Sequence, residues 1–463
     1  MTVPTPLRVA IVGSGPAAFF TADQLCARED VGVSVDMLER LPAPFGLVRF
    51  GVAPDHQKIK AVTKQFDKAA RRPNVRFFGN VEVGLTVTLA ELQAHYHVVC
   101  FATGAQTDRR LGIPGEDFAR SHPATEFVAW YNGHPEFRDR TFDLNVERVA
   151  VIGVGNVAVD VARILCRTPE ELATTDIADY AETALRASRV REVVMLGRRG
   201  PLQAAFTNPE VRELGEMPGA DVRARADEVT LDPLSQRALD DSDDRAQRKK
   251  LEILTGFTTR QRRGKPRLLT LRFLASPVEL LGNEAGEVVG MRIVRNRLEA
   301  AGDGTRLKAV PTDQVENLPL QLVFRSVGYH GVPLPGVPFD ERSGTVPNDK
   351  GRVLQSTGEP MRGVYVSGWI KRGPSGVIGT NKADAAETVD TILADVSGDA
   401  IPSPAHTSPE AAECLLRTRQ PRCVSYDDWL RLDELEVARG KATGRPRVKF
   451  TSVADMLEAL ERR

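Results

Sequence analysis

The sequence contains few cysteines, and their spacing argues against several kinds of site. The five are Cys26, Cys100, Cys166, Cys414 and Cys423. None of them forms a C-x-x-C pair, and an odd number does not make a complete disulfide framework. This argues against a disulfide framework, a structural zinc site and a bound iron–sulfur cluster, so we expect no metal site. The first three have apolar neighbours, and we expect them to be core thiols.

Net charge and long apolar runs are also missing. The 463 residues include 62 Lys and Arg and 62 Asp and Glu, so the formal net charge is zero. This argues against a general nucleic-acid binder, although it leaves room for a local basic patch. No apolar run approaches the length of a membrane span. The N-terminal stretch MTVPTPLRVAIVG has no signal-peptide pattern. We therefore expect a cytoplasmic protein of about two to three domains.

A glycine-rich loop follows the first apolar run. Residues 7–25, LRVAIVGSGPAAFFTADQL, place the pattern G-x-G-x-x-A between a β-branched run and a helical pattern. The glycines allow a sharp turn close to a pyrophosphate, which the N–H groups of the helix start would bind. A second strand, VSVDMLE, ends at Glu39, about 20 residues further on, where a carboxylate binds ribose hydroxyls and repels a 2′-phosphate. The first site therefore predicts FAD or NAD.

The same pattern occurs a second time. Residues 149–166, VAVIGVGNVAVDVARILC, contain Gly153, Gly155 and Ala158 in the equivalent spacing. The strand that closes this unit, EVVMLGRR, delivers Arg198 and Arg199 where the first unit has its acid. Arginine forks match phosphate oxygens, so the second site predicts NADP. Two dinucleotide sites in one chain are typical of a flavoprotein that takes electrons from a nicotinamide.

The order of these motifs predicts an α/β protein with two Rossmann-like domains. Residues 97–116 and 320–336 each contain a strand followed by a turn-rich crossing, and they bracket the second loop. We expect an FAD domain in residues 1–107 and 326–463, with an NADP domain, 108–325, inserted between them. Residues 167–190 predict a helical, surface-exposed insert, and residues 236–250 predict one exposed helix. The tail from residue 410 predicts further helices.

Several long motifs resemble the adrenodoxin reductase type of ferredoxin–NADP⁺ reductase, including its actinobacterial members. They are LVRFGVAPDHQKIK, FFGNVEVG, GVGNVAVDVARIL, GRRGPLQAAFT, FRSVGY and GWIKRGPSGVIGTNKADA. The resemblance implies a glutathione-reductase-like fold with bound FAD and NADPH. It also implies hydride transfer from C4 of the nicotinamide to N5 of the flavin, followed by one-electron transfers to an acidic iron–sulfur ferredoxin. The direction of electron flow stays open, and the family favours a monomer.

The resemblance also implies two sets of cofactor-binding residues. For FAD they are a phosphate loop, the ribose acid, two backbone contacts, a tryptophan where related flavoproteins have an aspartate, and a segment facing the flavin ring. These are Gly13, Gly15, Pro16, Ala17 and Ala18; Glu39; Leu47 and Val81; Trp369; and Gly376, Val377 and Ile378. The NADP contacts implied are Arg109, Asn156, Val157, Ala158, Arg198, Arg199 and Glu210.

Three further residues are candidates for the active site. The resemblance implies that His56 and Asp160 approach each other across the domain boundary, with Glu213 near the nicotinamide. A carboxylate beside a histidine favours the protonated ring. The histidine could handle a proton for the flavin, hold the domains in a reactive pose, or be structural. We favour a supporting role, because hydride transfer needs no side-chain acid.

For the acceptor, the resemblance implies a basic docking region. Its positions are Arg212, Arg245, Arg248 and Lys249. The alternative is a solvated charged helix. A disulfide oxidoreductase shares the two-site plan but needs a cysteine pair, which this chain lacks. An electron-feeding subunit of an amidotransferase and a quinone or dye diaphorase stay as alternatives to a ferredoxin reductase.

Overall fold

The computed structural model describes residues 6–28, 31–301 and 307–462, and the chain divides into two compact units. The first unit comprises Met1–Thr107, Asn132–Arg138 and Tyr329–Arg463, and the second comprises Asp108–Tyr131 and Asp139–Gly328. In chain order the second unit is therefore inserted into the first. The chain passes between the units near strands β5 (Thr107–Asp108) and β15 (Tyr329–His330).

Residues 132–138 belong to the first unit, although the sequence-based domain limits place them in the second. The His134 ring lies 4.9 Å from the Phe50 ring. The Nζ atom of Lys449 donates to the carbonyl of Asn132 at 3.0 Å. These partners lie far away in the sequence, which is why local patterns do not reveal this excursion.

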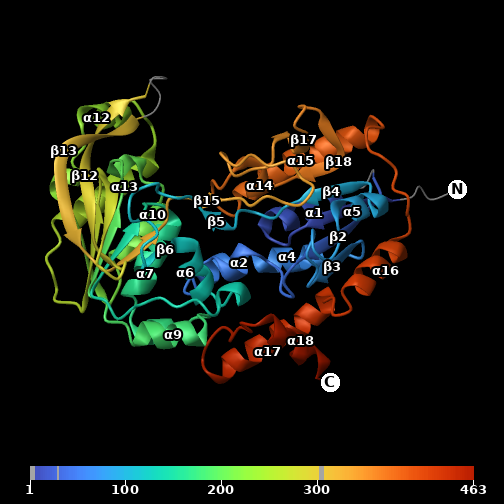
Figure 1. The fold of residues 1–463 in the computed structure, drawn as a ribbon, viewed down its shortest axis with the longest axis horizontal. Helices are drawn as coiled ribbons and strands as arrows, with labels where there is room; N and C mark the ends of the chain where they lie inside the picture. The colour runs from blue at the N-terminus through green and yellow to red at the C-terminus, as the bar shows by residue number, and fades with distance from the viewer. Residues whose placement is uncertain (1–5, 29–30, 302–306, 463) are drawn as a thin grey trace. The chain divides into compact units, whose positions relative to one another are not determined.

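The first unit is built on a seven-stranded sheet with the order β16-β17-β18-β4-β1-β2-β3 (Figure 1). The strands from β18 to β3 are parallel, and the short β16 and β17 add an antiparallel edge. The strands are β1 (Leu7–Val12), β2 (Val33–Glu39), β3 (Val75–Gly79), β4 (Val98–Phe101), β16 (Asn348–Asp349), β17 (Arg352–Leu354) and β18 (Pro360–Val366).

Both faces of this sheet are covered, as a parallel sheet requires. Alternate residues of β1 enter different apolar clusters, because side chains along a strand point to opposite faces. Val9 and Ile11 join one cluster, and Ala10 and Val12 join the other. The helices of the unit are α1 (Pro16–Cys26), α2 (Leu47–Phe50), α3 (Gln57–Lys60), α4 (Thr63–Ala70), α5 (Leu89–His95), α14 (Trp369–Arg372), α15 (Thr380–Ser397), α16 (Pro409–Arg419), α17 (Tyr426–Ala442) and α18 (Val453–Glu461), with a 3₁₀ turn at Pro135–Phe137.

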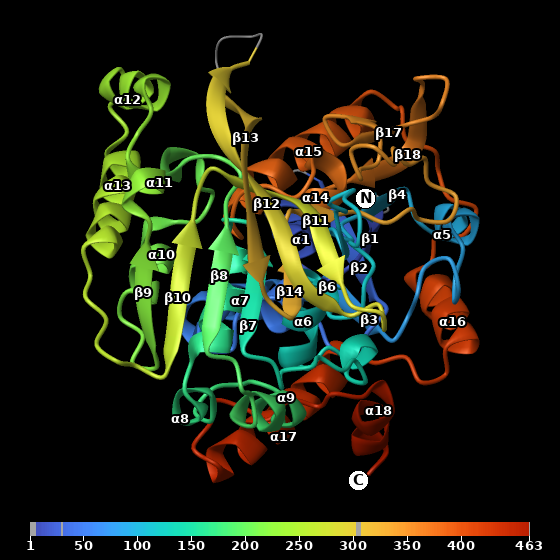
Figure 2. The ribbon, with the colours of Figure 1, turned by 60° about the vertical axis from the view of Figure 1, so that its left-hand side comes forward.

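The second unit has a six-stranded sheet with the order β6-β14-β7-β8-β10-β9 (Figure 2). All its pairings are parallel. The strands are β6 (Ser121–Pro123), β7 (Arg148–Ile152), β8 (Glu192–Leu196), β9 (Ala220–Ala224), β10 (Arg267–Arg272) and β14 (Leu322–Arg325). An antiparallel three-stranded sheet, β11 (Ala275–Gly282), β12 (Val288–Ala300) and β13 (Leu307–Pro319), shares an apolar cluster with β7 through Ala150, Ile152, Met291 and Ile293.

Helices of the second unit correct two expectations about exposed helices. Residues 236–250 form parts of two helices, because Asp244 accepts hydrogen bonds from the N–H groups of Ala246 and Gln247 and starts a new helix. The insert 167–190 is helical, but it buries Leu172 and Leu185. The helices are α6 (Ala124–Tyr131), α7 (Asn156–Cys166), α8 (Pro169–Leu172), α9 (Asp179–Arg186), α10 (Asn208–Leu214), α11 (Ala226–Val229), α12 (Pro233–Asp240) and α13 (Arg245–Thr258), with a 3₁₀ turn at Pro201–Gln203.

A buried ion pair ties the C-terminal helix α17 to α2 within the first unit. Glu436 on α17 is fully buried and accepts hydrogen bonds from both terminal nitrogens of Arg49 on α2. Arg447 and the N–H group of Phe450 also donate to this carboxylate, at 3.2 and 2.9 Å. The Arg49 guanidinium lies 4.9 Å from the centre of the Trp429 ring. The tail therefore stabilises α2, which lies beside the first glycine-rich loop.

The three cysteines expected in the core are buried or partly buried. Cys100 and Cys166 are buried and Cys26 is partly buried. Across the described residues, no helix combines the length and the apolar character that a membrane crossing needs.

Candidate functional site

The first glycine-rich loop joins β1 to α1 with an open helix start. Gly13 has φ +105°, and a Cβ atom there would lie 2.7 Å from the carbonyl oxygen of Ala102. A Cβ atom on Gly15 would have no neighbour within 4 Å, so there is open space above this residue. Pro16 is the first residue of α1, Ala17 and Ala18 are buried in its first turn, and no side chain caps the helix. The loop therefore fits a pyrophosphate at the start of α1.

Glu39 lies beside this loop at the end of β2. Its Oε2 accepts hydrogen bonds from the N–H and hydroxyl groups of Ser14, at 3.1 and 2.6 Å. Its Oε1 accepts from the N–H group of Leu41 at 3.1 Å. Burial raises the pKa of Glu39, and these hydrogen bonds act in the opposite direction. The carboxylate is thus fixed at the edge of the phosphate loop, where a ribose would follow the pyrophosphate.

Two other expected FAD contacts lie around the same loop. Leu47 is the first residue of α2 and directly follows Gly46, where a Cβ atom would lie 3.1 Å from Cα of Gly15. Val81 is buried, and its N–H group donates to the carbonyl of Glu39 at 2.9 Å. The N–H group of Val81 therefore already has a protein partner.

Trp369 begins α14 at the end of β18, beside α1. The preceding Gly368 has φ +82°, and a Cβ atom there would lie 2.5 Å from Cβ of Ala17. The N–H group of Gly368 donates to the carboxylate of Asp384 on α15. The indole N–H of Trp369 donates to the carbonyl of Ser375 at 3.2 Å. Trp369, the first loop and the residues before α15 are thus brought together within the first unit.

The segment before α15 is exposed at its centre. Val377 is 55% exposed. Its N–H group donates to the hydroxyl of Thr380 at 3.1 Å. Gly376 has φ +76°, and Ile378 packs against the core of the unit. The apolar surface of Val377 is available to a flat ligand, whereas its N–H group would have to be shared with Thr380.

The second loop repeats the geometry of the first between β7 and α7. Gly153 has φ +137°, and a Cβ atom there would overlap the carbonyl oxygen of Ser326. A Cβ atom on Gly155 would have no neighbour within 4 Å. Asn156 begins α7, and its Oδ1 accepts from the N–H group of Thr207 at 2.9 Å. Val157 is partly buried and Ala158 is buried. This loop also fits a pyrophosphate.

The arginine pair lies one and two residues beyond the position expected from the first unit. Strand pairing aligns Ile152 with Leu196, so the residue opposite Gly153 is Gly197. Arg198 is exposed and Arg199 is partly buried. Within the described ranges, neither guanidinium has an ion-pair partner. Burial and then the neighbouring Arg198 lower the pKa of Arg199. Two cations without a protein anion are chemically suited to a phosphate.

Arg163, which the sequence analysis did not single out, gathers three of the predicted residues. It lies on α7 and is fully buried. Its guanidinium contacts Asp160 at 2.8 Å, Glu210 at 3.2 Å and Glu213 at 3.3 Å. The sequence contains one signal for this arginine, because Arg163 lies three residues after Asp160 in a helical pattern. The three carboxylates are therefore held in one cluster beside the second loop's helix.

The remaining candidates are placed by separate elements. His56 directly precedes α3 in the first unit, and Asp160 is in the second unit, so their approach stays a prediction. Arg109 is exposed, and its N–H group donates to the carbonyl of Gly328 at 2.9 Å.

The four basic docking candidates lie on two helices of the second unit that contact each other, α10 and α13. Arg212 and Arg245 are exposed. Arg248 donates to the carbonyls of Leu239 and Ser242, both at 2.7 Å. Lys249 pairs with Glu252 at 2.6 Å. Arg212 and Arg245 are therefore the better candidates for contacts with a partner.

Comparison with known proteins agrees with this geometry. Residues 7–213 match the family model described as pyridine nucleotide-disulphide oxidoreductase. The chain is 48% identical to the NADPH-ferredoxin reductase FprA of Mycobacterium tuberculosis, with 98% of each chain covered. It is 42% identical to human mitochondrial NADPH:adrenodoxin oxidoreductase, covering 98% of this chain and 92% of the human one. The solved structure of M. tuberculosis FprA in complex with NADPH superposes with a TM-score of 0.91, at 48% identity, covering 98% of this chain and all of FprA.

These relatives match the chain over nearly its full length, and the predicted fold class is confirmed. The chain belongs to the NADPH-ferredoxin reductase family of the adrenodoxin reductase type.

Proposed function

We propose that this chain is an FAD-dependent NADPH–ferredoxin reductase. One observation supports it best: two equivalent dinucleotide loops differ at the strand end that reads the adenosine ribose. The first loop has the partly buried carboxylate of Glu39, and the second has Arg198 and Arg199 without a protein anion. A carboxylate suits ribose hydroxyls, whereas paired guanidinium groups suit a 2′-phosphate. The first loop therefore holds FAD and the second holds NADP(H).

The bound cofactors supply hydride transfer from C4 of the nicotinamide to N5 of the flavin, and one-electron delivery to an iron–sulfur acceptor. The protein binds and orients them. Gly13 to Ala18 bind the FAD pyrophosphate through the start of α1, and Glu39 binds the ribose. The segment from Gly376 to Ile378, with the apolar surface of Val377, would lie against the flavin ring, and Trp369 would close the site beside Ala17.

On the NADP side, Asn156, Val157 and Ala158 present the start of α7 to the pyrophosphate. Arg198 and Arg199 bind the 2′-phosphate, and Arg109 is a further contact. The cluster around Arg163 holds Glu210 as a ribose contact and Glu213 near the nicotinamide. Because Asp160 belongs to the same cluster, its carboxylate is oriented by Arg163.

His56 has a supporting role in this proposal. It receives or returns a proton near the flavin edge, or it maintains the reactive pose of the two cofactors. The pre-steady-state rate of flavin reduction by NADPH in His56→Gln tests both roles. A rate equal to that of the wild type would remove any major part for this histidine.

The acceptor is an acidic ferredoxin that docks on α10 and α13. Exposed arginines there would attract an acidic partner over a distance of about 10 Å, which is the Debye length at 0.1 M salt. Arg212 and Arg245 are free of side-chain partners among the described residues, which supports their place in this surface.

The purified protein tests the main proposal directly. We expect a yellow protein with flavin bands that reduces ferredoxin with NADPH much faster than with NADH. Replacing both arginines, Arg198→Ala with Arg199→Ala, should erode the NADPH preference and leave the flavin spectrum unchanged. Arg262→Ala is the control, because this arginine is exposed on a different loop. A colourless protein that binds no FAD, or reduction of dyes and quinones but of no ferredoxin, would contradict the proposal.

A further inference from the structure

The main chain of the arginine segment is held by the turn between β10 and β11. The N–H group of Gly197 donates to the carbonyl of Arg272 at 2.9 Å, and the N–H group of Ala275 donates to the carbonyl of Gly197 at 3.0 Å. The N–H group of Leu274 donates to the carbonyl of Arg199 at 3.0 Å. These bonds fix the backbone from which both guanidinium groups project.

Leu274 adopts a backbone conformation that few residues of its kind adopt. Its φ is +54°, in the left-handed region, which is unfavourable for a residue other than glycine. Its N–H group bonds to Arg199, and its carbonyl accepts from the N–H group of Asn296 at 2.7 Å. The turn is therefore held in a strained conformation by hydrogen bonds on both sides.

Asn296 on β12 completes this arrangement with its side chain. It is 3% exposed, and its Nδ2 donates to the carbonyl of Arg198 at 2.7 Å and to the hydroxyl of Ser276 at 2.8 Å. Its Oδ1 has no hydrogen-bond partner in the described part of the chain. Burying an amide that is only half satisfied is unfavourable, so packing alone does not explain an asparagine here.

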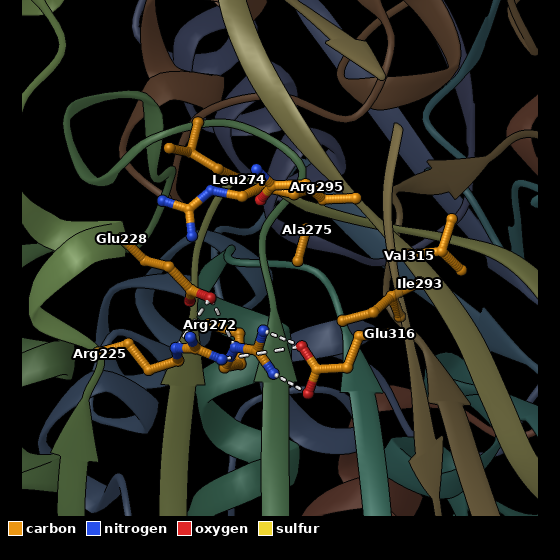
Figure 3. A pocket seen from close by; sticks show the side chains of 10 residues that line it. Arg225, Glu228, Arg272, Leu274, Ala275, Ile293, Arg295, Val315 and Glu316 are labelled. Carbon is orange, nitrogen blue, oxygen red and sulfur yellow. Dashed lines mark hydrogen bonds and ion pairs between the residues drawn. The ribbon is translucent and has the colours of Figure 1, made fainter. Parts of the chain in front are cut away.

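Leu274 and Ala275 line a pocket together with several charged groups (Figure 3). Arg272 pairs with Glu228 at 2.8 Å and with Glu316 at 2.7 Å. The second oxygen of Glu228 accepts from the N–H group of Phe273 at 2.9 Å. This ion network fixes the end of β10, so the turn at Leu274 starts from a rigid base. The three arginines around the pocket, Arg225, Arg272 and Arg295, are matched by nearby carboxylates, so we assign it no anion of its own.

We infer that Asn296 is a positioning residue for the 2′-phosphate site. By binding the carbonyl of Arg198, and by holding Leu274 against Arg199, it sets the direction of both guanidinium groups before NADPH arrives. A phosphate site needs its donors placed to within about 0.5 Å, and a loop that is free to move would lose this precision. The inference rests on the proposed binding of the 2′-phosphate by Arg198 and Arg199.

The test is the binding of two adenosine ligands to the FAD-loaded protein. The probes are 2′,5′-ADP, which contains the 2′-phosphate, and 5′-AMP, which lacks it. Asn296→Leu keeps the size of the side chain and loses both of its N–H donors. We expect its affinity for 2′,5′-ADP to fall about tenfold, which is the loss expected when one hydrogen bond between the arginines and the phosphate is broken. Affinity for 5′-AMP should stay within about twofold, and the KM for NADPH should rise with little change in kcat.

Two matched variants control for general damage to the unit. Asn317→Leu replaces an exposed amide on the neighbouring strand β13 and should change neither affinity. Leu274→Asn keeps the backbone hydrogen bonds and introduces a residue that tolerates positive φ, so it should retain the preference for 2′,5′-ADP. If Asn296→Leu does not fold, Asn296→Ala replaces it in the same assays.

The outcomes separate this inference from the proposed function. If replacing both arginines weakens 2′,5′-ADP but Asn296→Leu does not, the positioning role is wrong and the NADP site stands. An equal loss for both ligands in Asn296→Leu would also overturn the role, because it would indicate general damage. If the double arginine variant itself binds 2′,5′-ADP normally, the proposed NADP site is wrong.

Discussion

Glu39 and Gly197 occupy the same position in the two dinucleotide-binding units. In the first unit Val12 pairs with Leu38, and in the second Ile152 pairs with Leu196. The N–H group of Gly13 donates to Leu38 and that of Gly153 to Leu196, at 2.7 and 2.9 Å. The second unit thus lacks a carboxylate at this position and adds two cations immediately after it. Under the proposed assignment, the absence of an acid at this position favours NADP together with the two arginines.

This correspondence predicts the effect of an acid at position 197. In Gly197→Asp, we expect kcat/KM for NADPH to fall about tenfold or more below that of Gly197→Asn, because a carboxylate repels the 2′-phosphate. A Cβ atom at this position would lie 2.9 Å from Cγ1 of Val154, and both variants share this crowding. NADH should discriminate little between them. Equal values of kcat/KM for NADPH in the two variants would show that charge at this position does not select the cofactor.

The cluster around Arg163 predicts a large loss of stability when the cation is removed. In Arg163→Met, three carboxylates lose their buried partner, and we expect the free energy of unfolding to fall by about 3–5 kcal/mol at pH 8. Denaturant unfolding at pH 8 measures it. Arg186→Met, which breaks an exposed pair with Glu182, should cost less than about 1 kcal/mol. A similarly small effect in Arg163→Met would contradict the assigned role.

The partly buried carboxyl group of Asp108 predicts that the stability of the protein depends on pH. Burial raises its pKa to about 6, although Thr125 donates to it from both its N–H and hydroxyl groups. Because the folded state then binds the proton more tightly than the unfolded state, stability falls as the pH rises from about 4 to about 6. Asp108→Asn keeps an acceptor for Thr125 and removes the charge, so it should be more stable than the wild type at pH 8, by at most about 3 kcal/mol. Thermal unfolding at pH 4.5 and pH 8 measures the difference.

The control for Asp108 is Asp139→Asn, which neutralises an exposed acid. We expect it to shift the melting temperature by the same small amount at both pH values. An equal gain at pH 4.5 and pH 8 in Asp108→Asn would show that burial of its charge is not the cause.

The docking surface predicts a defect confined to the protein acceptor. Arg245→Glu should raise the KM for ferredoxin about three- to tenfold at low salt, and the effect should fade as salt is added. Reduction of ferricyanide by NADPH should not change. Arg189→Glu alters the net charge equally on another exposed loop and should leave the ferredoxin KM unchanged. Arg248 is a poorer probe, because its guanidinium holds two backbone carbonyls. A normal ferredoxin KM in Arg245→Glu would remove this arginine from the surface.

The buried pair of Glu436 and Arg49 predicts a link between the tail and the flavin. In Glu436→Gln we expect the free energy of unfolding to fall by about 3–5 kcal/mol, because Arg49 and Arg447 lose their buried anion. Arg49 lies on α2, two residues after Leu47, so FAD should also dissociate more readily. The ratio of flavin to protein absorbance after gel filtration measures it. Glu434→Gln, exposed on the same helix, should behave as the wild type. Full stability in Glu436→Gln would show that the pair is dispensable.

Local patterns predicted the parts of the site that depend on neighbouring residues. Both phosphate loops, their helices and the acid at the end of β2 can be predicted from short stretches. In each loop, a β-branched run is followed by the glycines and then by a helical pattern. The strand register that places Gly197 opposite Gly153 depends on pairing between strands. The sequence analysis therefore put the arginines at the position equivalent to Glu39, which Gly197 occupies in the structure. The roles of Asn296 and Glu436 depend on partners about 100 and 390 residues away. No local pattern contains such contacts.

The sheet that holds the flavin loop also sets an order for biosynthesis. Strand β4 lies between β1 and β18, and β18 comprises residues 360–366, so the first loop is made early but its sheet is completed late. The ion pair that stabilises α2 comes later still, from α17. The inserted unit ends at residue 328, so all of its strands leave the ribosome before β18 does. On a translating ribosome, the second unit can therefore fold before the sheet of the first unit is complete.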